Sequence, residues 1–170
     1  MIILICGTTH TGKTLLSQKL MEKHKIPYLC IDHLKMGLIR SGQTQLKAED
    51  DAPLTPYLWR IIKEIIKTAV ENNQSMIIER CYIPFDWKKD FTDEYLSQIK
   101  YYCLVMSAEY IENNFAKICE YENAVEKRLQ SGGIDKKELI KDNLNNLQLC
   151  KKYGLNYILI DKDYDIKIEL

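Results

Sequence analysis

The sequence predicts an α/β domain in which a five-stranded parallel sheet is covered by helices on both faces. Five short apolar segments alternate with longer helical patterns, and a glycine-containing loop follows the first of them. Strands joined through helices favour a parallel sheet with right-handed connections. No linker, repeat or low-complexity tract divides the 170 residues. Residues 1–170 are therefore predicted to form a single domain.

The predicted strands are short runs of apolar and β-branched side chains, as in buried parallel strands. They span residues 2–6, 27–32, 75–79, 101–106 and 156–161.

The segments between the strands have the periodicity of helices. The most regular one is predicted to begin with Thr55 as N-cap and Pro56 as its first residue. Ser107 is predicted to cap the helix after the fourth strand. Asp135 followed by Glu138 resembles a capping box that opens the last helix.

The composition argues against several classes of protein. Basic and acidic side chains number 24 each, so the formal net charge is zero and no overall field attracts nucleic acid or anionic membranes. The six cysteines are scattered, which disfavours a zinc site or a disulfide framework. The apolar run at residues 2–6 is too short for a signal sequence or a membrane span. We expect a cytoplasmic monomer or homodimer that binds neither membranes nor nucleic acid.

Residues 7–14, GTTHTGKT, have the spacing of a P-loop, or Walker A motif, and follow a predicted strand and open a predicted helix. Gly7 and Gly12 allow a tight turn and a close approach to an anion. The loop N–H groups and the helix N-terminus supply fixed positive potential. Lys13 is predicted to bind the β- and γ-phosphates of ATP and to act in catalysis, and Thr14 is the predicted Mg²⁺ ligand.

The predicted ATP-binding set is the whole loop with the first helical residues. It comprises Gly7, Thr8, Thr9, His10, Thr11, Gly12, Lys13, Thr14 and Leu15. His10 is expected to shape the backbone, and Cys6 before the loop is expected to belong to the core. The alternative is a strand-to-helix turn that carries these residues by chance.

With this motif the chain resembles the P-loop kinases of small molecules, the group of adenylate, shikimate and gluconate kinases, over nearly its whole length. The stretch IDHLKMG at residues 31–37 is most similar to bacterial proteins described as adenylate kinase-like or 2-phosphoglycerate kinase-like. The resemblance implies a three-layer P-loop NTPase fold with strand order 2-3-1-4-5. It also implies an acceptor-binding segment at about residues 33–73 and a short helical lid at about residues 115–134.

Phosphoryl transfer requires a carboxylate that orients or deprotonates the acceptor. Asp32 is the first candidate because it is predicted to end the second strand, and the carboxyl ends of parallel strands line the ligand site. The alternative role for Asp32 is capping the next helix. Glu79, at the end of the third strand, is the second candidate, for a magnesium-bound water or an acceptor hydroxyl. Asp161 imitates the acid of a Walker B strand but is interpreted as nonfunctional.

Arginine is scarce, and its planar fork binds phosphate or carboxylate oxygens in pairs. Arg40, Arg60 and Arg80 are predicted to bind the acceptor, because related nucleoside monophosphate kinases hold the acceptor phosphate with arginines in similar places. Surface salt bridges are the alternative. Arg128, in the expected lid, is predicted to stabilise the transferring phosphoryl group, and an ordinary basic helix end is its alternative.

The sequence thus predicts an ATP-dependent small-molecule kinase that uses Mg²⁺ and acts on a small anionic acceptor, a nucleotide, a nucleoside or a phosphorylated or carboxylated metabolite. A nucleotide-binding ATPase switch and a polynucleotide kinase are the alternatives. An aromatic cluster lies near the predicted acceptor-side segments and either packs in the core or stacks on a base. Its members are Tyr57, Trp59, Tyr82, Phe85 and Trp87.

Overall fold

The computed structural model describes residues 1–121 and 134–168. Its strands are β1 (Ile2–Gly7), β2 (Tyr28–Cys30), β3 (Met76–Glu79), β4 (Ile99–Met106) and β5 (Tyr157–Ile160). Its helices are α1 (Lys13–His24), α2 (Ile31–Arg40), α3 (Asp51–Glu71), η1 (Trp87–Asp90), α4 (Asp93–Leu96), α5 (Ala108–Glu120) and α6 (Lys136–Lys152).

The five strands form one sheet of order β2-β3-β1-β4-β5, and every neighbouring pair is parallel. Both the parallel sheet and its predicted order are confirmed. Ile5 of β1 lies beside Glu79 of β3, so the loop after β1 and the end of β3 meet at the same edge of the sheet. This edge, formed by the carboxyl ends of the strands, carries the predicted site.

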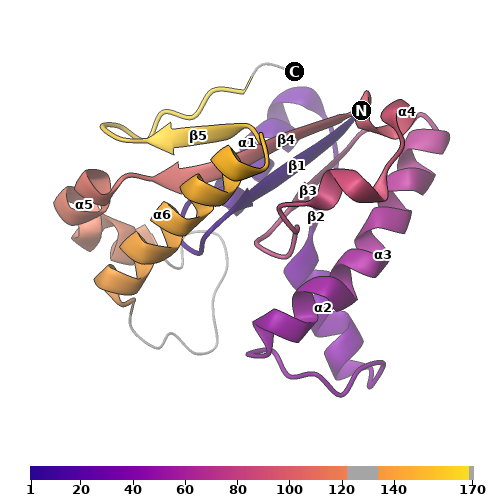
Figure 1. Ribbon diagram of the computed structural model, residues 1–170, viewed down its shortest axis with the longest axis horizontal. Coiled ribbons are helices and arrows are strands. Elements are labelled where there is room, and N and C mark those ends of the chain that lie inside the picture. Colours follow the sequence, from indigo (N-terminus) through magenta and orange to yellow (C-terminus); the bar gives the residue numbers. More distant parts are fainter. Residues whose placement is uncertain (122–133, 169–170) are drawn as a thin grey trace.

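Helices cover both faces of the sheet and give three layers (Figure 1). Alternate residues of β1 face opposite layers, as the two-residue period of a strand requires. Leu4 packs in a cluster with Leu58 and Ile62 of α3. Ile5 packs in the other cluster, with Leu16 of α1 and Ile111 of α5. All six side chains are essentially buried, so the central strand anchors both cores.

The predicted start of the most regular helix is wrong. Helix α3 begins at Asp51, so Pro56 lies inside it and Thr55 donates its hydroxyl to the carbonyl of Asp51. Pro53 falls in the first turn, where the backbone N–H has no helical partner and proline is tolerated. Burial of Leu54, which is 1% exposed, favours this additional turn.

The second strand is also shorter than predicted, because β2 ends at Cys30 and α2 begins at Ile31. Asp32 therefore lies in the first turn of α2 and not at a strand end. It does not cap the helix either, since Cys30 is the N-cap residue. An acid in the first turn is favourable because it faces the positive end of the helix dipole.

Both predicted caps are confirmed. Ser107 accepts a hydrogen bond from the backbone N–H of Tyr110, and Asp135 accepts from those of Lys137 and Glu138. None of the described helices is long and apolar enough to cross a membrane.

Candidate functional site

The loop between β1 and α1 has the backbone shape expected of an anion-binding turn. Gly7 has a φ of 140°, and a Cβ atom there would lie 2.6 Å from the carbonyl oxygen of Leu104. Gly12 has a φ of 77° and is the N-cap residue of α1. His10 also has a positive φ, of 63°, in keeping with its predicted role in shaping the backbone. The loop thus depends on glycine at both of its ends.

Lys13 is folded back onto this loop. Its ammonium donates to the carbonyl of Thr8 at 2.5 Å, and the residue is only 5% exposed. Burial lowers the pKa of this ammonium, since it disfavours the charged form. An anion bound in the loop would compensate for that desolvation, so Lys13 is suited to binding phosphate.

Thr14 and Glu79 meet beside the loop. The Thr14 hydroxyl donates to Oε1 of Glu79 at 3.2 Å, and the Glu79 residue is fully buried at the end of β3. Its Oε2 makes no hydrogen bond within the described residues. Cys30 is a neighbour, and burial together with Glu79 raises the pKa of its thiol. A buried carboxylate oxygen without a hydrogen bond is costly unless a cation or donor joins it.

These two side chains fit a magnesium ion. Mg²⁺ takes oxygen ligands, keeps several waters and uses few protein groups. Thr14 supplies a hydroxyl at the loop, and Glu79 has an oxygen available for the ion or for one of its waters. The described residues contain no cluster of three or more His, Cys, Asp or Glu side chains suited to a metal, so most ligands would have to be phosphate oxygens and water.

Asp32 and Arg80 form a buried ion pair at the same edge. Arg80 Nη2 contacts Asp32 Oδ2, with the side chains only 15% and 17% exposed. Burial opposes the charge of the guanidinium, but the Asp32 carboxylate raises the pKa of Arg80 overall. Two residues predicted separately, one as a catalytic acid and one as an acceptor cation, are therefore in direct contact.

Lys35 contacts this ion pair as well, and it is not among the residues predicted from the sequence. Its Nζ lies 3.2 Å from Asp32 Oδ1 and donates to the Tyr82 hydroxyl at 2.8 Å. Tyr82 in turn donates to Asp51 at 2.6 Å, and burial with this hydrogen bond raises the pKa of its phenol. Lys35 was detectable, because it follows Asp32 by three residues and shares its helix face.

Two further residues contact the loop from the C-terminal third of the chain. Asn143 of α6 donates to Thr8 Oγ1 at 3.0 Å, and the Tyr164 hydroxyl donates to the carbonyl of Thr11 at 3.0 Å. Asn143 stands in the apolar stripe of α6, between Leu139 and Leu147, which is a detectable signal for a buried polar residue. No sequence signal points to Tyr164.

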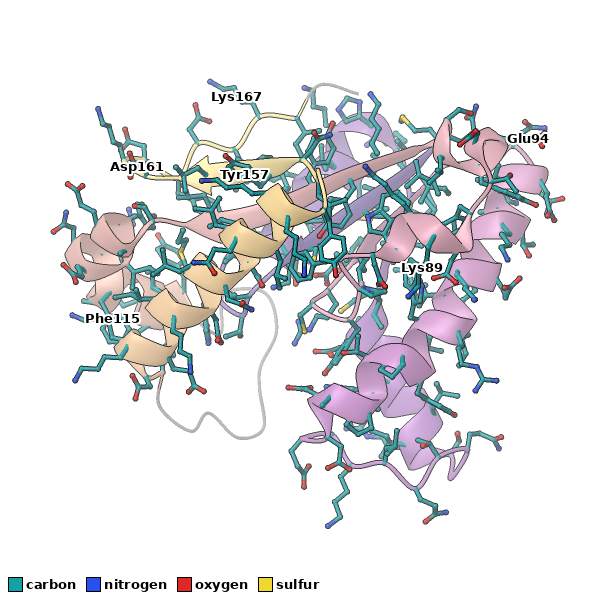
Figure 2. All side chains as sticks on the ribbon, viewed as in Figure 1. Lys89, Glu94, Phe115, Tyr157, Asp161 and Lys167 are labelled. Carbon is teal, nitrogen blue, oxygen red and sulfur yellow. The ribbon has the colours of Figure 1, made fainter. Side chains whose placement is uncertain are left out.

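Two of the predicted acceptor-binding arginines lie at exposed positions. Arg40 at the end of α2 and Arg60 on α3 are exposed. Arg128 and most of the expected lid lie outside the described residues. Asp161 is exposed in the loop beyond β5 and projects outward, away from β1 (Figure 2).

The aromatic cluster lies mainly in the core. Trp59, Tyr82 and Trp87 are at most 5% exposed, and Trp87 stacks on Tyr101 at 5.8 Å. Tyr57 and Phe85 are partly buried against the same core.

The sheet order and the loop define a three-layer P-loop NTPase fold, as predicted, and solved structures of small-molecule kinases share this fold. Shikimate kinase from Acinetobacter baumannii, solved with shikimate, is 14% identical with a TM-score of 0.56 over 96% of this chain and 84% of its own. Shikimate kinase from Bacteroides thetaiotaomicron is 13% identical with a TM-score of 0.51 over 96% and 89%.

A gluconokinase from Sinorhizobium meliloti 1021 is 13% identical with a TM-score of 0.45, over 94% of this chain and 81% of its own. No protein-family model matches the chain, and no curated protein sequence matches it significantly. The chain therefore shares the fold of the two shikimate kinases at low sequence identity.

Proposed function

We propose that the protein is a kinase that transfers the γ-phosphoryl group of ATP to a small anionic metabolite. The observation that carries the proposal is the arrangement at one sheet edge of the loop with Lys13, the buried Thr14–Glu79 contact, and the Asp32–Arg80 pair. The groups proposed to bind the donor thus lie near those proposed to orient the acceptor, as transfer between two bound molecules requires.

On the donor side, the N–H groups of residues 7–15 and the Lys13 ammonium would bind the phosphates. Lys13 would leave the Thr8 carbonyl and bind the β- and γ-phosphate oxygens. Thr14 and Glu79 would hold magnesium, which when bound neutralises charge on those oxygens. The donors are fixed before the reaction, so stabilising the transition state requires little reorganisation.

On the acceptor side, Asp32 would accept a hydrogen bond from the reacting hydroxyl or orient the reacting phosphate. Because the transition state of phosphoryl transfer is loose, orienting the acceptor matters more than strong basicity. Arg80 and Lys35 keep positive charge beside it, which favours an acceptor with a carboxylate or phosphate. Arg40 and Arg60 are proposed as further acceptor contacts, and Arg128 as the cation that stabilises the transferring group.

The test has two stages. Calorimetry with and without magnesium first measures whether the purified protein binds ATP. A panel of nucleosides, nucleoside monophosphates, sugar acids and phosphoglycerates is then screened for acceptor-dependent release of ADP. Release that depends on one acceptor supports a kinase. Acceptor-independent hydrolysis would favour the ATPase switch, and phosphorylation of oligonucleotides would favour the polynucleotide kinase.

A further inference from the structure

Two residues from the C-terminal third of the chain, Asn143 and Tyr164, hold the loop between β1 and α1 in place. Asn143 is fully buried and links three elements through its amide. Its Oδ1 accepts from the N–H of Met106 at the end of β4 at 2.8 Å. Its Nδ2 donates to Thr8 Oγ1 at 3.0 Å and to the Leu139 carbonyl at 2.8 Å. The hydrogen-bonding capacity of the Asn143 side chain is therefore almost fully satisfied, and Thr8 is linked to α6 and β4.

Tyr164 makes the second contact, from the segment after β5. Besides donating to the Thr11 carbonyl, its hydroxyl lies only 1.7 Å from the position that a Cβ atom on Gly12 would occupy. Ile166 and Ile168 pack with the same core as α1, and Ile168 is 6% exposed. The C-terminal segment is thus anchored by these isoleucines beyond Tyr164, and by the buried Ile160 of β5 before it.

Both contacts act on atoms that decide where the loop's donors point. The Thr11 carbonyl and the Gly12 N–H belong to one planar trans peptide, so they point in opposite directions. When Tyr164 fixes the carbonyl, it also fixes the Gly12 N–H toward the side away from the phenol. Asn143 fixes Thr8, whose carbonyl accepts from the Lys13 ammonium at 2.5 Å.

We propose that Asn143 and Tyr164 are positioning residues that hold the loop in its phosphate-binding shape before a nucleotide arrives. The inference rests on the proposed function, namely that the loop binds a nucleoside triphosphate. A pre-formed site binds more tightly because less conformational freedom is lost on binding. Helix α6 and the C-terminal segment are then parts of the nucleotide site, although neither belongs to the motif.

The test measures the binding of ATP and of inorganic tripolyphosphate by calorimetry at fixed magnesium. Tripolyphosphate carries the phosphates without a base, so it reports on the loop alone. Tyr164→Phe keeps the ring and removes one hydrogen bond. It is expected to weaken the binding of both ligands about three- to tenfold, the usual range for one neutral hydrogen bond. Asn143→Ala removes the link to Thr8 and is expected to weaken both at least as much.

Two control variants separate positioning from general destabilisation. Tyr110→Phe changes another buried tyrosine of the same core, and Cys150→Ala changes a fully buried residue of α6. Both are expected to bind the two ligands like the wild type, whatever their melting temperature. If Asn143→Ala does not fold, Thr8→Val removes the same hydrogen bond from the other side and replaces it in the test.

The outcomes are distinguishable. Wild-type protein that binds neither ligand would refute the proposed function itself. Wild-type binding with unchanged affinities in Tyr164→Phe and in Asn143→Ala or Thr8→Val would refute only the positioning role. A loss for ATP without a loss for tripolyphosphate would also refute it, because Tyr164 would then act on the base and not on the loop.

Discussion

The donor side and the acceptor side of the candidate site differ in structure: one is mainly a backbone loop, and the other is a network of charged side chains. The donor side is built mainly from consecutive residues of the loop, joined by Glu79 of β3, and the shape of the loop rests on backbone torsions at Gly7 and Gly12. The acceptor side is a network of long charged side chains from separate elements, centred on Asp32 with Arg80 and Lys35. Backbone amides do not titrate and keep their dipoles as the pH changes, whereas ion pairs depend on both pH and salt. Apart from the loss of the Lys13 charge, mutation should therefore affect the donor side through geometry, and it should affect the acceptor side through charge.

The largest effect is expected for Lys13→Ala. The variant loses the mobile ammonium of the loop, and we expect acceptor-dependent ADP release to fall about a thousandfold, the upper range for removing one transition-state contact. Coupled assays of ADP formation measure this. Lys19→Ala, an exposed lysine on the same helix, is the control and should be fully active. Undiminished transfer by Lys13→Ala would remove the donor side from the mechanism.

A fall in turnover of about a hundredfold is expected for Asp32→Asn, in line with the loss of a positioned acid–base group. The donor side does not contain Asp32, so ATP affinity by calorimetry should stay near the wild-type value. Asp93→Asn, at an exposed acid in the first turn of α4, serves for comparison. If Asp32→Asn turned over at the wild-type rate, the role would pass to Glu79, the second candidate.

Arg80→Ala and Arg40→Ala should raise the KM for the acceptor more than that for ATP. About tenfold is expected for Arg80, which is buried against Asp32, and less for Arg40, which is exposed. Arg80→Lys, which keeps the charge but loses the planar fork, should fall between the wild type and Arg80→Ala. An effect confined to the KM for ATP would mean that these arginines serve the donor side.

The same contrast explains which features could be predicted from the sequence. The loop was predictable because Gly7, Gly12, Lys13 and Thr14 are close in sequence and each has a local reason for its identity. The sheet order followed from the resemblance that this motif carried. The contact between Asp32 and Arg80 joins residues 48 positions apart, and no local pattern indicates such a pair.

Predictions from local capping and periodicity patterns were wrong where tertiary packing decided the boundary of a helix or strand. Thr55 and Pro56 form a valid helix start, yet α3 begins at Asp51 because Leu54 is buried and Asp51 accepts a hydrogen bond from Tyr82. Asp32 was placed at a strand end because the apolar run at residues 27–32 reads as one strand. The change from β2 to α2 at Ile31 occurs inside that run, where periodicity over so few residues cannot distinguish strand from helix.

The smallest expected effect tests whether charge also stabilises the contact between η1 and α3, which we call the frame of the acceptor side. Asp90 of η1 accepts from Trp59 and Lys63 of α3, both at 2.9 Å. Burial opposes ionisation of this carboxyl, but the two hydrogen bonds leave its pKa below the ordinary value. Asp90→Asn should cost about 1 kcal/mol of the free energy of unfolding at pH 7, measured with urea. Asp86→Asn, at an exposed ion pair with Lys89, should cost almost nothing.

The pH dependence of this loss identifies its origin. A lowered pKa stabilises the folded state fully above the ordinary aspartate pKa, about 3.9, and the stabilisation is lost as the pH falls through the lowered value. The difference between wild type and Asp90→Asn should thus be constant from about pH 7 to pH 5 and shrink below about pH 4. A difference that persisted unchanged at lower pH would show that packing, not the carboxylate charge, holds η1 to α3. The frame of the acceptor side would then be as insensitive to pH as the donor loop.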